Sequence, residues 1–195
     1  MKKAEAAAKA VRVITVPPLV VIAFVGILSV LTDGTVFCPA DTAVTILLLG
    51  IVPALAYPLQ RFVPAFRDQG RHGQRRFAFV ISLLGYTLAV FCGLLSHASR
   101  PLLLIDLTYL ISVILLTLCN LLLPIRPSGH LCSITGPMSL LVHFLGWNVI
   151  LPCFVLLLLV GWSSVYLHRH TIAETISGSC VGILGYLLAA LFTLS

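Results

Sequence analysis

Long apolar runs separated by short polar loops make up almost the whole chain, and each run is long enough to cross the hydrocarbon core of a bilayer as a helix. The clear runs cover residues 13–31, 43–59, 77–97, 102–123 and 172–194. Pro17 and Pro18 fall in the first turns of the first run, where a helix tolerates proline, whereas Pro53 and Pro58 predict an irregular second helix. The pattern predicts an all-α integral membrane protein.

The region between the fourth run and the last run allows two interpretations. A single helix over residues 138–160 would cross the bilayer, giving a bundle of six transmembrane helices. Two short helices over residues 131–145 and 149–166, turning back at Gly146-Trp147-Asn148, would give seven. Hydrophobic periodicity leaves both alternatives open.

The two alternatives place the polar ends of the chain differently. With one helix, His130 and His170 face opposite sides of the membrane, and with two helices they face the same side. In the seven-helix arrangement eleven of the twelve Lys and Arg residues share one side with the N-terminus and the basic loop 60–76, and in the six-helix arrangement ten do. Both distributions predict a cytoplasmic N-terminus in the cell membrane, because cytoplasmic loops carry the excess of basic residues.

Composition supports one polytopic membrane domain over residues 1–195. Hydrophobic residues make up 59% of the chain and charged residues only 9%, against about 25% charged in soluble domains. The net charge of +6 comes from loops between apolar runs, so no nucleic-acid partner is expected. The six Cys show no Cys-x-x-Cys spacing, so no metal site is predicted. No cofactor is expected, and the sequence leaves the oligomeric state open.

The first polar cluster is the turn Arg126-Pro127-Ser128-Gly129-His130, which leads into an apolar run. A helix start offers free backbone N–H groups and the positive end of the helix dipole, which together bind anions. Gly129 allows a ligand to approach the backbone closely, and Arg126 can contact two phosphate oxygens at once. This turn is therefore predicted to bind phosphate, with His130 able to donate a proton to a leaving oxygen.

A second polar cluster begins at Ser163-Ser164 and continues to His170 and Glu174. His170 can attack phosphorus as a nucleophile. Glu174 lies four residues further on, one helical turn away, where a carboxylate can fix the tautomer of the imidazole. Polar residues at membrane depth are costly and tend to be functional, so both clusters are expected to belong to one active site at one membrane face.

These residues resemble the motifs of the type 2 phosphatidic acid phosphatase superfamily, which are Lys-x6-Arg-Pro, Pro-Ser-Gly-His and Ser-Arg-x5-His-x3-Asp. The second motif is complete at residues 127–130, and the third corresponds to Ser163-Ser164, five residues, His170, three residues and Glu174. The family holds two short helices between these motifs, which favours the seven-helix alternative. The match is closer to a compact subgroup of small prokaryotic members, in which the first and second motifs are fused.

The resemblance implies a metal-independent lipid phosphatase acting on a membrane lipid, either a phosphatidyl phosphate or a prenyl diphosphate. His170 would form a phosphohistidine, and His130 would protonate the leaving group. Arg126, Ser128 and the Gly129 backbone would hold the phosphoryl oxygens.

The chain departs from the family pattern at three positions. Ser164 stands where the third motif has Arg, Glu174 where it has Asp, and Cys119 where the first motif has Lys. We hypothesise that other basic residues on the same side bind phosphate instead, namely Arg71, Arg75, Arg76 and Arg169. The same departures motivate a second hypothesis, a non-hydrolytic lipid-phosphate binding or transport protein. A third is a phosphotransferase with an acceptor other than water.

Overall fold

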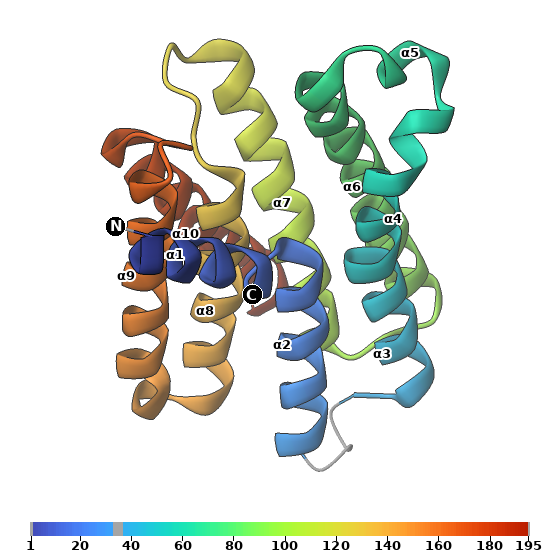
Figure 1. Cartoon of the computed structure of the whole chain (residues 1–195). Helices are drawn as coiled ribbons and strands as arrows, with labels where there is room; N and C mark the ends of the chain where they lie inside the picture. Colours follow the sequence, from blue (N-terminus) through green and yellow to red (C-terminus); the bar gives the residue numbers. More distant parts are fainter. Residues whose placement is uncertain (1, 33–36, 195) are drawn as a thin grey trace.

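The computed structural model describes residues 2–32 and 37–194, and every regular element within them is helical (Figure 1). The α-helices are α1 (Lys2–Ile14), α2 (Pro17–Leu31), α3 (Pro39–Thr45), α4 (Val52–Leu59), α5 (Pro64–Arg67), α6 (Gly70–Leu95), α7 (Arg100–Leu122), α8 (Gly129–Leu145), α9 (Ile150–Tyr166) and α10 (Ile172–Leu194). The other turns are the π-helical η1 (Ile46–Ile51) and the 3₁₀-helical η2 (Gln60–Phe62) and η3 (Trp147–Val149).

Several of these helices could cross a membrane. Five helical segments of the described chain are long and apolar enough, and the bent pair α1–α2 would be a sixth if it counts as one span. The five are Pro39–Phe62, Gly73–Leu95, Arg100–Leu122, Trp147–Tyr166 and Ile172–Thr193. Helix α8 is apolar but has only 17 residues. The all-helical prediction is confirmed, and the number of spans, six or seven, stays a prediction.

The first apolar run is not one continuous helix from residue 13, as the pattern predicted. Helix α1 ends at Ile14, α2 begins at Pro17, and the two axes differ by 59°. Pro17 and Pro18 occupy the first positions of α2, and proline disfavours helical backbone in the residue before it. Val16 accordingly has φ −59° and ψ 137°. Helix α1 therefore lies across the long helices instead of continuing α2 (Figure 1).

The basic segment 60–76 was expected to be a loop, but α6 begins inside it at Gly70. Arg75 and Arg76 therefore lie on the second turn of a long helix. The second apolar run is irregular, as its prolines predicted. The π-helical turn η1 lies just before Pro53, which has no N–H to continue a regular hydrogen-bond ladder.

The region between α7 and α10 forms two helices, as the second alternative predicts. Helix α8 ends at Leu145, and the chain turns at Gly146, which has φ 76°, a value that glycine adopts readily. Helix α9 then runs back antiparallel to α8 (Figure 1). The single helix over residues 138–160 does not form. The start of α8 and the end of α9 consequently lie at the same end of the bundle.

Helix α10 packs tightly against α7 and α8 through three glycines. A Cβ atom at Gly178 would lie 2.8 Å from the backbone N of Ser128, and one at Gly182 would lie 2.6 Å from the carbonyl oxygen of Cys132. A Cβ atom at Gly185 would overlap the side chain of Ser112. Small residues permit this close approach of helices. The packing fixes the first turn of α10 beside the turn that precedes α8.

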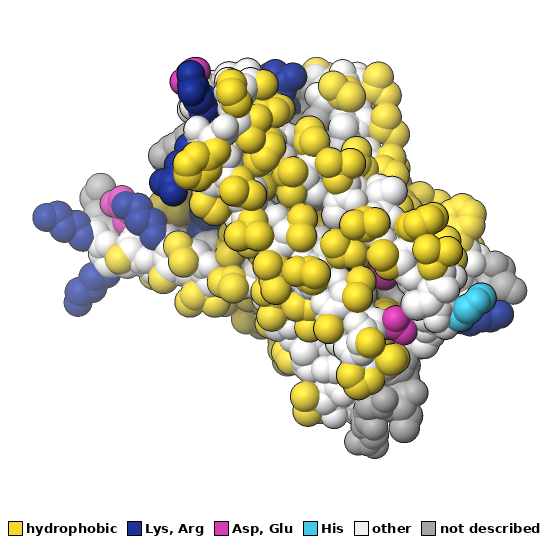
Figure 2. All heavy atoms as spheres, turned by 90° about the vertical axis from the view of Figure 1, so that its right-hand side faces the viewer, with side chains coloured by type: hydrophobic (Ala, Val, Ile, Leu, Met, Phe, Trp, Pro, Cys, Tyr) yellow, Lys and Arg dark blue, Asp and Glu magenta, His cyan; other side chains and the backbone are white. Residues whose placement is uncertain are grey.

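Hydrophobic side chains cover much of the outer surface. Figure 2 shows one face on which they predominate, with Lys and Arg gathered mainly at one end and on a projecting arm. Of the Lys and Arg residues in the part of the chain that the structure describes, only Arg100 belongs to the other end, at the start of α7. An apolar outer surface with basic residues at one end fits a helix bundle in a bilayer.

Candidate active site

A cavity of about 540 Å³ lies at the basic end of the bundle, among α2, α4, α6, α7 and α8. This volume is in the range of small-molecule binding sites. Basic and imidazole side chains line it, and among the described residues no Asp or Glu does. The cations and imidazoles are Arg12, Arg75, His130, His168, Arg169 and His170. A site of this charge favours an anionic ligand.

The turn before α8 is tied directly to the start of α10. Ser128 is fully buried, and its backbone N–H donates to the carbonyl oxygen of Glu174 at 2.8 Å. Its hydroxyl accepts from the backbone N–H of Leu131 at 3.4 Å and so caps the N-terminus of α8. Ser128 thus joins the two polar clusters, and its hydroxyl is occupied by capping and does not line the cavity.

His130 is the second residue of α8 and lines the cavity. Its Nε2 lies 3.0 Å from Oγ1 of Thr15, and that hydroxyl lies 2.7 Å from the carbonyl oxygen of Val11. A hydroxyl has one hydrogen, and Thr15 donates it to Val11. The Thr15 oxygen therefore accepts from Nε2–H of His130, which leaves Nδ1 as the ring nitrogen that can exchange a proton.

His170 reaches the cavity because the chain reverses sharply after α9. His168 has φ 52°, and its backbone N–H donates to Val165 O at 3.0 Å. The N–H of Arg169 donates to Ser164 O, also at 3.0 Å. These two bonds form a Schellman motif, in which His168 takes the left-handed position that is usually glycine. The reversal brings His170 back toward the start of α8.

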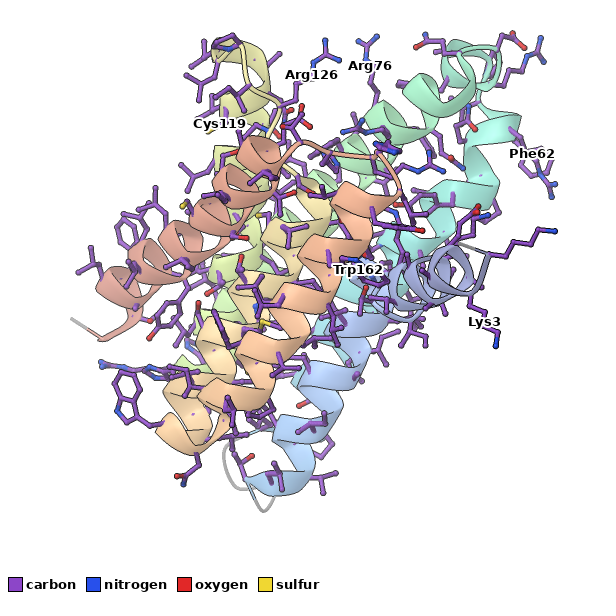
Figure 3. All side chains as sticks on the ribbon, turned by 60° about the vertical axis from the view of Figure 1, so that its left-hand side comes forward. Lys3, Phe62, Arg76, Cys119, Arg126 and Trp162 are labelled. Carbon is purple, nitrogen blue, oxygen red and sulfur yellow. The ribbon has the colours of Figure 1, made fainter. Side chains whose placement is uncertain are left out.

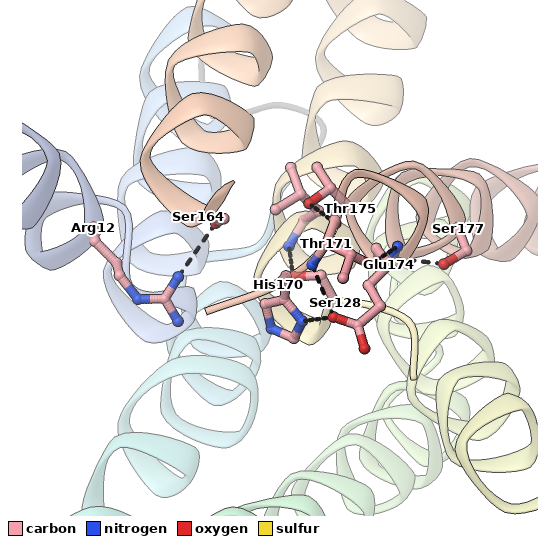
Figure 4. Close-up of polar contacts among 9 residues, drawn as sticks. Arg12, Ser128, Ser164, His170, Thr171, Glu174, Thr175 and Ser177 are labelled. Carbon is pink, nitrogen blue, oxygen red and sulfur yellow. Dashed lines mark hydrogen bonds and ion pairs between the residues drawn. The ribbon is translucent and has the colours of Figure 1, made fainter. Parts of the chain in front are cut away.

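Glu174 does not line the cavity, and its carboxylate contacts the ring of His170 (Figure 4). Its Oε2 lies 3.1 Å from Nδ1 of His170 and accepts from the backbone N–H of Thr171 at 3.0 Å. The N–H of Glu174 donates to Oγ1 of Thr171 at 3.2 Å, which completes a capping box at the start of α10. One carboxylate therefore caps the helix and directs Nδ1–H of His170 toward itself, leaving Nε2 with the free lone pair.

The surroundings keep the His170 ring neutral. Burial lowers its pKa below 6.5, and the hydrogen bond and charge of Glu174 oppose that shift. The positive charges of Arg75 and Arg12 lower the pKa further. A neutral imidazole at pH 7 has the unprotonated nitrogen that a nucleophile needs.

The structure brings some of the predicted site residues together and leaves others apart. Gly129, His130, Arg75, Arg169 and His170 line the cavity.

Two predicted phosphate-binding arginines do not line it. Arg76 and Arg126 are exposed and point outward at the same end of the molecule (Figure 3). The backbone of Arg71 lies in α6, but its side chain lies outside the described part of the structure, so its predicted role stays a prediction.

Arg12 and Thr15, on and just after α1, belong to the site and were not predicted from the sequence. Nη1 of Arg12 donates to Oγ of Ser164 at 3.2 Å, at the position where the third motif has Arg (Figure 4). In the sequence Arg12 was one of several basic residues flanking the first apolar run. The usable signal was Pro17, because a helix that ends before it can turn its last residues into the bundle.

Comparisons with models of protein families, with curated proteins and with solved structures found no match to this chain. The assignment of function therefore rests on the chemistry of the cavity. Among the described residues no group of three or more His, Cys, Asp or Glu side chains is arranged to hold a metal ion.

Proposed function

We propose that this chain is an integral membrane hydrolase that removes phosphate from a lipid phosphate or a prenyl diphosphate through a phosphohistidine intermediate. One observation carries the proposal: His130 and His170 line the same cation-rich cavity, and Glu174 holds Nδ1 of His170 so that Nε2 is free. Two imidazoles placed in this way can serve as nucleophile and general acid in phosphoryl transfer.

The reaction proceeds in two displacements. Nε2 of His170 attacks phosphorus, and the bond between phosphorus and the leaving oxygen breaks. His130 enters this step as the imidazolium, a form that the negative charge of the bound phosphate favours, and gives its Nδ1 proton to the leaving oxygen while Nε2–H stays on Thr15. Water then attacks the phosphohistidine while Nδ1 of His130 accepts a proton from it. The P–N bond breaks, and inorganic phosphate leaves with both histidines restored. Glu174 stabilises the positive charge that His170 acquires during the attack.

Charged and backbone donors would stabilise the transferred phosphoryl group. Arg75 and Arg169 line the cavity with His170, and the start of α8 presents its first N–H groups at Gly129 and His130. Preorganised donors of this kind typically contribute the largest part of the electrostatic stabilisation in such reactions.

The surroundings of the cavity favour a lipid substrate. Apolar residues such as Val16, Val113 and Leu116 line it together with the cations, and the helices around it expose apolar side chains. The phosphate would bind at the basic end while the hydrocarbon tail stays in the bilayer. The positive-inside rule places this end and the N-terminus on the cytoplasmic side of the cell membrane.

The test is phosphate release from a panel of phosphatidyl phosphates and prenyl diphosphates by purified protein in lipid nanodiscs. His170→Ala should lower kcat/KM by at least about 10³-fold, because the nucleophile is removed. His143→Ala is the matched control, since His143 pairs with Tyr186 at the other end of α8 and should leave release unchanged. Equal release by wild type and His170→Ala would refute the proposal.

A second candidate function is non-hydrolytic binding or transport of lipid phosphates. It is favoured by Ser164, which replaces a guanidinium of the third motif, and by Arg126, which points away from the cavity. Saturable binding of a lipid phosphate without release of phosphate by the wild-type protein would support this function over hydrolysis.

A further inference from the structure

We propose that α1 is a working part of the active site, in which Arg12 binds a phosphoryl oxygen in place of the guanidinium missing at position 164. In the same site Thr15 positions the general acid His130. The substrate in this inference rests on the proposed function. The anion-binding role of Arg12 does not, because it follows from the contacts and charges around that side chain.

Arg12 lacks the partner that a partly buried guanidinium normally has. Among the described residues its one hydrogen-bond partner is the hydroxyl of Ser164, and no carboxylate pairs with it. Arg169 and Arg75 are close enough to act on its charge, and both are positive. Five N–H donors among like charges are stabilised when an anion binds between them.

The position of Arg12 also matches the place where a phosphate would meet His170. The carbonyl oxygen of Ser164 accepts the backbone N–H groups of Arg169 at 3.0 Å and of His170 at 3.4 Å. Its hydroxyl accepts from Arg12 at 3.2 Å. The guanidinium is thereby placed beside the loop that carries the nucleophile, and it lines the same cavity.

The fold explains why a residue so far away in sequence reaches this point. Ala8 is fully buried where α1 packs against α9, the helix that carries Ser164. Helix α1 ends before Pro17, so its last turn faces the cavity instead of continuing into α2. The more N-terminal Lys9 is exposed and pairs with Glu5, so it is not available to the cavity.

Thr15 is a positioning residue. It is buried, and it accepts from Nε2–H of His130 because its own proton goes to the carbonyl oxygen of Val11. This contact fixes the ring orientation and leaves the Nδ1 position for the transferable proton. Thr15 therefore acts on His130 in the way that Glu174 acts on His170, by holding the nitrogen that does not react.

The main experiment compares Arg12→Ala, Arg12→Lys and the control Lys9→Ala in nanodiscs. Two quantities are measured: kcat/KM on a lipid phosphate and the affinity for orthovanadate by calorimetry. We expect Arg12→Ala to lose about 10²- to 10³-fold in kcat/KM and to bind vanadate more weakly. Arg12→Lys should retain an intermediate activity, since it keeps the charge but not the planar fork. Lys9→Ala should match wild type.

Moving the guanidinium tests the assignment further. The double variant Arg12→Ala with Ser164→Arg carries the group on α9 instead of α1 and should regain at least tenfold of the lost kcat/KM. For Thr15, Thr15→Val should lower kcat about tenfold and shift the basic limb of its pH profile, with little change in KM. Thr15→Ser keeps the oxygen and should restore both.

The outcomes separate this inference from the proposed function. If wild type releases phosphate from no lipid, hydrolysis is refuted, and weaker vanadate binding by Arg12→Ala still supports the anion site. If Arg12→Ala keeps wild-type vanadate affinity and activity, the inference is overturned whatever the wild type hydrolyses. If Arg12→Ala does not fold, Arg12→Lys decides: unchanged kcat/KM and vanadate affinity contradict the role, and a loss in both supports it.

Discussion

The Asp106–Thr45 pair and the cation-rich cavity are both polar regions among apolar helices, and they are built in opposite ways. Asp106 on α7 is almost fully buried, and Oγ1 of Thr45 donates to its Oδ1 at 3.1 Å. Beside it is a space of only about 80 Å³. In the cavity at the other end, by contrast, Arg12, Arg75 and Arg169 line about 540 Å³ without a carboxylate among the described lining residues. Asp106 and Thr45 pair with each other, whereas the cations of the cavity have no counter-charge among the described lining residues until an anion binds.

The largest loss of activity should come from Glu174→Gln, which changes the carboxylate that holds His170 at the cavity. An amide can donate to Nδ1 of His170, which favours the wrong tautomer, so kcat should fall about 10²- to 10⁴-fold. Initial rates on a lipid phosphate measure the loss. Glu5→Gln, which changes an exposed carboxylate on α1, is the matched control and should have no effect. Wild-type kcat in Glu174→Gln would show that the carboxylate serves only to cap α10.

The next effect concerns the packing of α10 against the turn before α8, where Gly178 meets Ser128. In Gly178→Ala the new methyl group would meet the Ser128 backbone, whose N lies 2.8 Å from the Cβ position, so α10 must move away from α8. We expect a loss of about 1–3 kcal/mol in the free energy of unfolding, measured by denaturant titration in micelles, together with lower kcat/KM. Gly26→Ala, which has open space at Cβ, should not lower stability. Normal activity in Gly178→Ala would mean that this packing does not align the histidines.

Substitutions in the Asp106–Thr45 pair should change stability and leave activity unchanged. Thr45→Val and Asp106→Asn, made singly and together, form a double-mutant cycle. Their coupling in the free energy of unfolding should be about 1 kcal/mol, the usual value for one hydrogen bond. The kcat/KM of all three variants should equal wild type, because neither Thr45 nor Asp106 lines the cavity. A change in KM for lipid phosphate would break the comparison by connecting the pair with the cavity.

The smallest effect expected is a shift in the pH dependence of kcat/KM. Burial and the charges of Arg75 and Arg12 lower the pKa of His170 below 6.5, and the neutral ring is the active form. The acidic limb of kcat/KM should therefore lie below pH 6.5. Arg75→Gln should move it upward, because a charge that lowers the pKa is removed. The same burial makes the unfolded chain bind more protons, so the free energy of unfolding should fall as pH drops through this window. A limb that does not move in Arg75→Gln would assign it to another group.

Local sequence signals predicted the fold well where a turn has a chemical signature. The apolar run of α10 gave both of its ends. Gly146 and Asn148 marked the turn between α8 and α9 in one of the two alternatives, and hydrophobic periodicity did not choose between them. The start of α6 was missed, because Gly70 within a basic segment looks like a loop residue. Arg75 lines the cavity and Arg76 does not. Neighbouring residues face different sides of a helix, so this difference could not be predicted without knowing that both residues lie on α6.

Half of the candidate site followed from motifs, and the other half depended on geometry with no local signature. His130, His170 and Glu174 carry their chemistry in their spacing, and the structure places the two histidines on one cavity. Arg12 reaches the cavity through the bend of 59° before Pro17 and the packing of α1 against α9, a contact between segments far apart in the sequence. The left-handed backbone at His168 could not be foreseen either, since this conformation normally signals glycine.

The central claim is that His170 attacks phosphorus directly, and the stereochemistry of the reaction tests it. A lipid phosphorothioate made chiral at phosphorus with oxygen isotopes is hydrolysed in water labelled with the third isotope, and the configuration of the product thiophosphate is determined. Each in-line displacement inverts phosphorus, so attack by His170 followed by attack of water predicts overall retention. Overall inversion would show that water attacks the lipid directly, and it would contradict the phosphohistidine mechanism.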